Sequence, residues 1–215
     1  MSKAVIFDMD GTLFQTEIIL EYSLRNTLNK LNEQKITYID NPVEKYNEIM
    51  GVPLIEVWRN LLHTPTEENS ALANNIFQKS LIDSITSGKS KLYDCVEDAL
   101  SDIKNKGYDI FVASNGDDEY LKAIYDYYGL DKYIKGVYSI NMINSGSKSD
   151  LVRQIISKEN IKPKYMIGDR LSDFMAGIDN DIETIGCRFY FSKKYELKQA
   201  SYTVNSLAEL KKIIK

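Results

Sequence analysis

The sequence holds little cysteine and little histidine, and these shortages exclude some kinds of chemistry. Its two cysteines, Cys95 and Cys187, form no CxxC pair and are too few for a disulfide framework, so free thiols in a reducing compartment are expected. The one histidine is His63, which leaves a catalytic cysteine without its usual activating base. Catalysis by a thiol nucleophile is therefore disfavoured.

Long apolar runs and dense basic patches are also missing. No apolar run approaches the roughly 20 residues that a helix needs to cross a bilayer. The first residues, MSKAVIFDMD, have too short an apolar core for a signal peptide. The net charge is −4, and the 27 lysines and arginines form no cluster that favours nucleic acid. These absences predict a soluble cytoplasmic protein without membrane or nucleic-acid partners.

The 215-residue chain has the composition of a globular protein, with 43% hydrophobic and 27% charged residues. A short apolar strand is expected over 3–7, followed by a block with helical periodicity over 16–87. After residue 88 strands and helices alternate, with further strands expected at 109–113, 136–140, 164–167 and 183–187. Repeated strand–helix units imply a parallel sheet covered by helices on both faces. The prediction is an α/β core domain, 1–15 and 88–215, with an inserted helical domain, 16–87.

Polar side chains gather at the expected strand ends. Asp8 and Asp10 follow the first strand two residues apart, and alternation along an extended chain places both on one side. Two neighbouring carboxylates repel each other unless a cation neutralises them or one takes a proton. Ser114 and Asp169 also fall at carboxyl ends of expected strands, where ligands bind in such folds. The pattern favours a metal-held nucleophile beside a proton donor.

Four motifs stand in order along the chain. They are DMDGT at 8–12, Ser114-Asn115-Gly116 after an apolar run, Lys148 at a helix start, and GDRLSD at 168–173. With the helical insertion after the first motif, the chain resembles hydrolases of the haloacid dehalogenase (HAD) superfamily, in the branch of phosphoglycolate phosphatase and beta-phosphoglucomutase. The resemblance implies a Rossmann-like core with a parallel sheet and an α-helical cap domain.

The resemblance also implies a mechanism. Asp8 would be the nucleophile that becomes an aspartyl-phosphate, and Asp10 would act first as general acid and then as general base. Ser114 and Lys148 complete the implied catalytic set. The implied phosphate-binding residues are Gly11, Thr12, Ser114, Asn115, Gly116 and Lys148. The implied cofactor is Mg²⁺, held by Asp8, the main-chain carbonyl of Asp10, Asp169 and Asp173.

Lys148 is unusual on local grounds alone. Ser147 resembles an N-cap, so Lys148 occupies the first helical turn, where the helix macrodipole disfavours a cation. The cost of a few tenths of a kcal/mol suggests a use in stabilising an anionic phosphate together with the helix end. The alternative is that Lys148 is an ordinary surface lysine exposed to solvent.

The expected substrate is a small phosphorylated metabolite such as phosphoglycolate, a sugar phosphate or a nucleotide. A phosphosugar mutase would use the same aspartyl-phosphate, but Leu20 and Leu54 stand where such relatives carry a histidine and an arginine. A catalytically idle protein that binds a partner through its cap is the alternative from another class, and the intact motifs argue against it. Related caps reach toward substrate at the loop around 50–52. The chain is expected to be a monomer or a homodimer.

Overall fold

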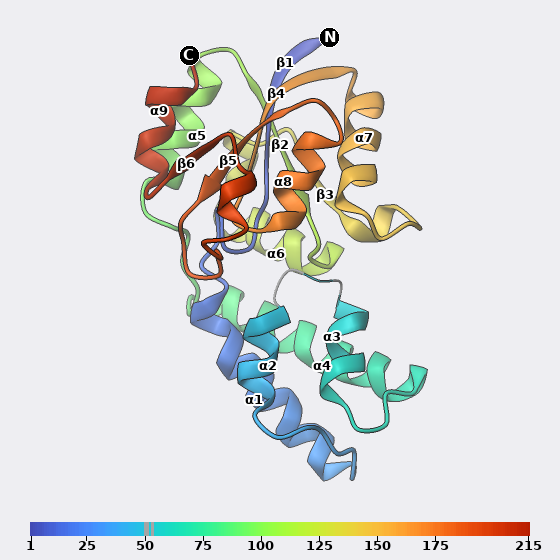
Figure 1. Cartoon of the computed structure of the whole chain (residues 1–215). Coiled ribbons are helices and arrows are strands. Elements are labelled where there is room, and N and C mark those ends of the chain that lie inside the picture. The colour runs from blue at the N-terminus through green and yellow to red at the C-terminus, as the bar shows by residue number, and fades with distance from the viewer. Residues whose placement is uncertain (50–51, 53) are drawn as a thin grey trace. The chain divides into compact units, whose positions relative to one another are not determined.

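A computed structural model describes residues 1–49, 52 and 54–215 (Figure 1). By their contacts these residues divide into two compact units. One combines Met1–Gln15 with Leu92–Lys215, and the other is Thr16–Lys91. In this division the second unit runs to Lys91, and the main-chain N–H of Lys89 bonds to the carbonyl of Ser84 in the last helical turn (3.0 Å).

The first unit is built on one parallel sheet, in which the described residues form six strands in the order β3-β2-β1-β4-β5-β6. The strands are β1 (Ser2–Phe7), β2 (Asp109–Ser114), β3 (Gly136–Ser139), β4 (Ile161–Gly168), β5 (Glu183–Cys187) and β6 (Tyr202–Val204). This confirms the predicted α/β fold with a parallel sheet. The edge strand β6 was not predicted, because three residues are too short to show a periodic pattern.

Helices cover both faces of this sheet (Figure 1). They are α5 (Val96–Asn105), α6 (Asp118–Tyr127), α7 (Lys148–Glu159), α8 (Leu171–Ile178) and α9 (Leu210–Ile213). On one face α7 and α8 contact each other and β4, and α5 packs with α9 elsewhere in the unit. Apolar side chains such as Ile6, Leu151 and Met166 are fully buried in one cluster on the α7 side. Burial of each of these side chains contributes roughly 1.5–3 kcal/mol to the free energy of folding. This packing holds in place the strands whose ends carry the polar residues.

The second unit is helical. Its described residues form α1 (Glu17–Glu33), α2 (Pro42–Ile49), α3 (Leu54–Leu61) and α4 (Glu67–Thr86). Trp58 is fully buried and meets the ring of Phe77 edge-on, with centroids 5.5 Å apart, so it belongs to the core of this unit. Met50 and Gly51, expected to reach toward substrate, lie outside the described residues. Within the described part of the chain, every helix is too short or too polar to span a bilayer.

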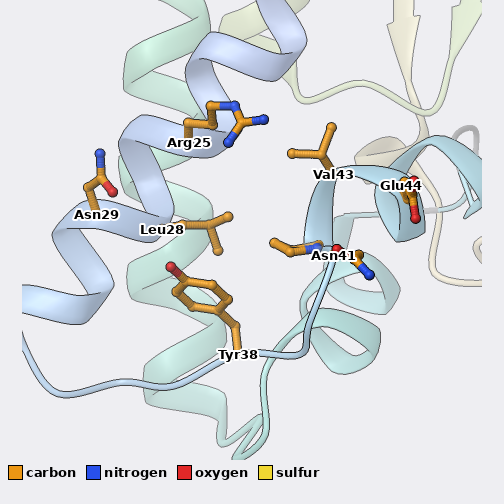
Figure 2. Close-up of a pocket in the computed structure, with 8 residues that line it drawn as sticks. Arg25, Leu28, Asn29, Tyr38, Asn41, Val43 and Glu44 are labelled. Atoms are coloured by element: carbon orange, nitrogen blue, oxygen red, sulfur yellow. The ribbon is translucent and has the colours of Figure 1, made fainter.

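The helical unit also has a surface hollow of about 500 Å³ beside α1 and the start of α2 (Figure 2). Its lining residues are Arg25, Leu28, Asn29, Tyr38, Asn41, Pro42, Val43 and Glu44. The guanidinium of Arg25 pairs with Glu21 one turn earlier in the same helix, at 2.8 Å. Because half of these lining residues are exposed and Arg25 already has a counter-ion, the hollow as described offers no concentrated charge to a ligand.

Candidate active site

The sheet order brings three of the predicted site residues to one edge. Asp8 follows β1 directly, Ser114 is the last residue of β2, and Asp169 follows β4 directly. Since β1 lies between β2 and β4 and all three are parallel, their carboxyl ends are neighbours. The main-chain N–H of Asp8 continues the ladder by donating to the carbonyl of Ile167, at 2.8 Å. The edge therefore presents these side chains together.

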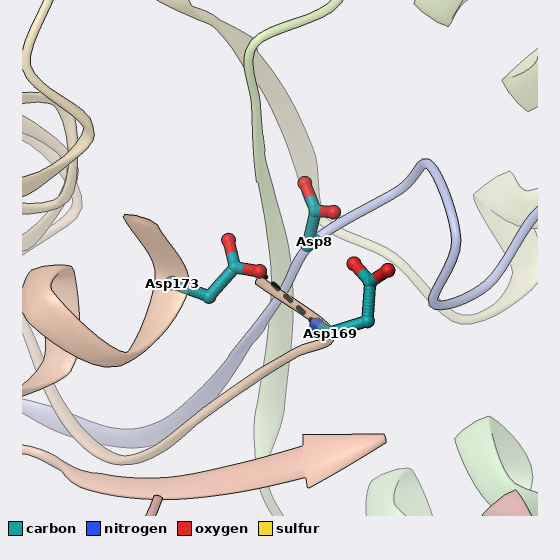
Figure 3. Close-up of side chains that lie close together, drawn as sticks. All are labelled: Asp8, Asp169 and Asp173. Carbon is teal, nitrogen blue, oxygen red and sulfur yellow. Dashed lines mark hydrogen bonds between the residues drawn. The ribbon is translucent and has the colours of Figure 1, made fainter. Parts of the chain in front are cut away.

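Three carboxylates meet at this edge (Figure 3). Oxygen atoms of Asp8, Asp169 and Asp173 lie within 4.8 Å of one another, and all three residues are buried. The Oδ2 atom of Asp169 is buried without a hydrogen-bond partner among the described residues. A buried acceptor left unsatisfied is costly, and a cation bound by oxygen ligands would remove that cost. The donor set therefore fits a hard divalent ion such as Mg²⁺.

Lys148 lies inside the same cluster. Its Nζ is 2.5 Å from Oδ1 of Asp8 and 2.5 Å from Oδ1 of Asp173. Burial alone would lower the pKa of this ammonium, but Asp173 and Asp8 reverse that effect and hold its pKa above the ordinary 10.5. Lys148 is the first residue of α7 after Ser147, whose side chain makes no capping hydrogen bond. The ammonium in the first helical turn is thus a buried charge and not a solvated one.

The charges in this cluster do not balance by themselves. Three carboxylates and one ammonium leave two negative charges, which is the charge that one divalent cation neutralises. Burial raises the pKa of Asp8 from 3.8 to about 8; Lys148 opposes this rise, while Asp173 and Asp10 add to it. Burial, Asp173 and Asp8 also raise the pKa of Asp169 well above its ordinary value. Without a cation, protons would take its place.

Asp173 also shapes the turn that presents Asp169. Its Oδ2 accepts hydrogen bonds from the main-chain N–H groups of Asp169 (3.1 Å) and Arg170 (3.0 Å) at the start of α8. The side chain of Asp173 therefore caps this helix. One carboxylate thus satisfies the turn with one oxygen and faces Lys148 with the other.

Gly168 is required by the close approach of Asp173. A Cβ atom at Gly168 would lie 2.2 Å from Cγ of Asp173, well inside van der Waals contact. We expect Gly168→Ala to lower the free energy of unfolding by about 1–3 kcal/mol, since the caged aspartate must move. Urea denaturation measures this. At Gly146 a Cβ would meet none of the described residues within 4 Å, so Gly146→Ala measures the strain of a positive φ (+66°) without a clash. A loss below about 0.5 kcal/mol in Gly168→Ala would contradict the steric argument.

The carboxylate of Asp10 contacts residues outside this cluster. Its Oδ1 accepts a hydrogen bond from the hydroxyl of Tyr120 at 2.6 Å, and Oγ of Ser114 lies 3.5 Å from its Oδ2. Among the described residues, the group that could hold a metal through side chains comprises Asp8, Asp169 and Asp173 without Asp10. This is compatible with the expectation that Asp10 contributes only its main-chain carbonyl, which stays a prediction.

The expected phosphate-binding amides are engaged in their own turns. The N–H of Gly11 donates to the carbonyl of Phe14 (3.0 Å), and that of Thr12 to the carbonyl of Met9 (3.3 Å). The N–H of Gly116 donates to Oγ of Ser114 (3.0 Å). These amides could bind a phosphate only by exchanging those bonds, so their role stays a prediction, as does that of Asn115.

Gly11 and Thr12 instead contact Asp169. The hydroxyl of Thr12 is 3.5 Å from Oδ1 of Asp169. Gly11 adopts a φ of +73°, and a Cβ there would lie 2.5 Å from Oδ2 of Asp169. The glycine of the first motif therefore lets the turn after β1 approach the acidic cluster.

Two residues of this region were missed by the sequence reasoning. Glu196 is buried and accepts hydrogen bonds from Nε of Arg170 and the main-chain N–H of Leu171, both at 3.0 Å. Burial would raise the pKa of Glu196, but these two donors hold it below its ordinary value. Tyr120 is the other residue. Neither residue has a local sequence signal, because the partner of each is more than 20 residues away in the sequence. The arginine in GDRLSD is the one sequence feature that could have indicated an acidic partner.

The family follows from a comparison with known proteins. Residues 5–187 match the model of the haloacid dehalogenase-like hydrolase family. The chain belongs to this family. The match covers all four motifs and confirms the predicted membership of the HAD superfamily, the parallel-sheet fold and an enzyme of the HAD hydrolase class.

Individual relatives are distant in sequence but similar over their whole length. A 5'-nucleotidase from Pseudomonas aeruginosa is 21% identical, over 98% of this chain and 94% of that protein. The crystal structure of a predicted phosphatase from Clostridium acetobutylicum has a TM-score of 0.78 and 28% identity, covering 99% of this chain and 98% of that one. A predicted phosphoglycolate phosphatase from Haemophilus somnus has a TM-score of 0.81 at 16% identity, covering 100% and 98%, and it shows the fold alone.

Proposed function

We propose that this HAD hydrolase is a Mg²⁺-dependent phosphatase that cleaves a small phosphomonoester through an aspartyl-phosphate on Asp8. The observation that carries the proposal is the buried cluster in which Lys148 and two further aspartates surround Asp8 at the carboxyl edge of the sheet. A carboxylate placed beside a buried ammonium and a cation-binding set suits attack on an anionic phosphate. The phosphatases among its relatives support the same reaction class.

The proposed reaction has two displacements at phosphorus. In the first, a carboxylate oxygen of Asp8 forms a bond to phosphorus while the ester P–O bond breaks, and Asp10 gives its proton to the departing oxygen. In the second, water attacks the same phosphorus, Asp10 takes one proton from that water, and the bond to Asp8 breaks. Inorganic phosphate leaves and both aspartates return to their starting states.

The proposed metal ligands are Asp8, Asp169, Asp173 and the main-chain carbonyl of Asp10. When bound, Mg²⁺ supplies the positive charge that keeps Asp8 ionised at neutral pH and offsets the charge of the phosphate. Lys148 stabilises the same charges by holding Asp8 and Asp173. Asp173 has a second role through its hydrogen bonds to the turn before α8.

We propose that the helical unit, expected over 16–87, acts as a cap that sets specificity and excludes water. Its chain begins just after the motif that holds Asp8 and Asp10, so substrate contacts on it would be linked directly to the catalytic turn. The relatives differ in the phosphorylated compounds that their names give, and the proposal is therefore limited to small phosphomonoesters. Leu20 is buried in α1, which does not favour the mutase alternative.

A substrate panel tests this proposal. The purified protein with MgCl₂ should release inorganic phosphate from at least one of phosphoglycolate, a set of sugar phosphates and the nucleoside monophosphates, with simple saturation kinetics. Free phosphate is measured directly, and the sugar products are followed by chromatography. Interconversion of sugar phosphates without phosphate release would support a mutase instead. A folded protein that turns over none of the panel would contradict the phosphatase proposal.

A further inference from the structure

Tyr120 in α6 is a buried residue whose hydroxyl donates a hydrogen bond to Asp10, the proposed general acid. The residue is 3% exposed, and its hydroxyl donates to Oδ1 of Asp10 over 2.6 Å. Hydrogen bonds between a hydroxyl and a carboxylate are strongest at 2.5–2.7 Å, so this is a tight contact. Oγ of Ser114 approaches the other oxygen, Oδ2, only to 3.5 Å, where a hydrogen bond is weak. The contact from Tyr120 to Oδ1 is thus much shorter than the contact from Ser114 to Oδ2.

The ring of Tyr120 is held by Phe14 and by the turn at Gly116. Phe14, just after DMDGT, meets it edge-on with centroids 6.2 Å apart and an interplanar angle of 81°. Gly116 leaves room on another side, because a Cβ there would lie 3.2 Å from Cδ1 of Tyr120. Since the ring is packed on both sides, its hydroxyl reaches Asp10 from a fixed point. The contact thus belongs to the packing of the catalytic unit and not to a mobile surface.

We propose that Tyr120 is the positioning residue for Asp10 and that it assigns the transferable proton to Oδ2. This inference rests on the proposed function. Because the tyrosine hydroxyl already donates to Oδ1, the proton that Asp10 gives to the leaving oxygen resides on Oδ2, and the same oxygen later accepts the proton of water. Tyr120 keeps donating to Oδ1 throughout, so it stabilises the carboxylate that remains after the first transfer.

The leaving group separates this role from a merely structural one. An alkoxide needs a proton as it departs, whereas 2,4-dinitrophenolate is stable without one. Tyr120→Phe keeps the ring and removes only the hydroxyl, so kcat/KM for the best alkyl phosphate of the panel should fall about 10–100-fold, which is part of the effect of a general acid. For 2,4-dinitrophenyl phosphate we expect less than about a 3-fold change. The ratio of the two values is independent of the folded fraction and is therefore measurable even in a destabilised variant.

Tyr125→Phe is the matched control on the same helix. Its hydroxyl donates to the main-chain carbonyl of Ile134 over 3.0 Å, away from Asp10. We expect this variant to leave the ratio of alkyl to dinitrophenyl kcat/KM unchanged. An equal loss on both substrates for Tyr120→Phe, or no loss on either, would overturn the inference.

Asp10→Asn distinguishes this inference from the proposed function. In Asp10→Asn, kcat/KM should fall more for the alkyl phosphate than for 2,4-dinitrophenyl phosphate, and this difference should be larger than in Tyr120→Phe. If Asp10→Asn is selective and Tyr120→Phe is not, the positioning role of Tyr120 fails while the phosphatase mechanism stands. If the wild-type protein releases no phosphate, or Asp10→Asn is unselective, the proposed acid–base role of Asp10 itself is wrong.

Discussion

Asp8→Asn should lower phosphate release at least about 10³-fold, because an amide oxygen cannot form the aspartyl-phosphate and the loss of a nucleophile is among the largest single effects in enzymes. The substitution is nearly isosteric, and the amide carbonyl can still accept the hydrogen bond from Lys148. Since it also removes one of three buried carboxylates, the metal-free variant in EDTA should melt at the same temperature as the metal-free wild-type protein or higher. Steady-state phosphate release and thermal unfolding measure the two effects.

Asp109→Asn is the matched control for that result. Asp109 begins β2, at the opposite end of the strand from Ser114, and its half-buried carboxylate pairs with the exposed Lys135 at 2.7 Å. A surface ion pair contributes about 0–1 kcal/mol, so both activity and stability should stay near the wild-type values. Activity of Asp8→Asn within about tenfold of the wild type would remove Asp8 as the nucleophile.

The residues that sequence reasoning identified are those with a local signal. Asp8 and Asp169 each follow an apolar run that ends at the sheet edge, and Lys148 is conspicuous as a cation in a first helical turn. Parallel strand–helix units imply that such strand ends share one edge, so the sequence could predict that these residues lie close together. The order of the strands was not, because it depends on long-range packing that no local pattern records.

The remaining contacts of the site arise from side chains brought together only by the fold. Tyr120 reads in the sequence as one aromatic residue on an amphipathic helix, and its hydrogen bond to Asp10 spans 110 positions. Glu196 lies in a loop after β5 and meets Arg170 over 26 positions. The turns after β1 and β2 likewise close on themselves through hydrogen bonds of Gly11 and Gly116, which spacing alone could not predict.

Removing divalent cations with EDTA should reduce phosphate release at least about 10²-fold, and excess Mg²⁺ should restore it, because a bound cation stabilises the charge of the reacting phosphate by several kcal/mol. The reason in this chain is the unbalanced pair of negative charges around Lys148.

The same imbalance predicts how stability depends on pH. Burial raises the pKa of Asp8 from 3.8 to about 8, so between these values the folded metal-free protein holds a proton that the unfolded chain has lost.

The stability of the metal-free protein should therefore fall as the pH rises from about 4 to about 8, since the unfolded state binds fewer protons over that range. Mg²⁺ binds the deprotonated carboxylates, so the rise in melting temperature that it causes should grow over the same interval. Near pH 8.5, with Mg²⁺ at about 100 times its dissociation constant, a rise of about 5–10 °C is expected. Thermal melts at a series of pH values, with EDTA or with MgCl₂, measure both trends.

Comparison with Asp8→Asn isolates the contribution of Asp8 from that of other titrating groups. The variant lacks the carboxyl whose pKa is raised, so its metal-free stability should fall less between pH 4 and pH 8 than that of the wild-type protein. It also has one ligand charge fewer, and Mg²⁺ should raise its melting temperature less. Two results together would contradict the metal site. If Mg²⁺ does not change the wild-type melting temperature at pH 8.5 and EDTA does not reduce activity, the buried carboxylates are balanced by protons and Lys148 alone.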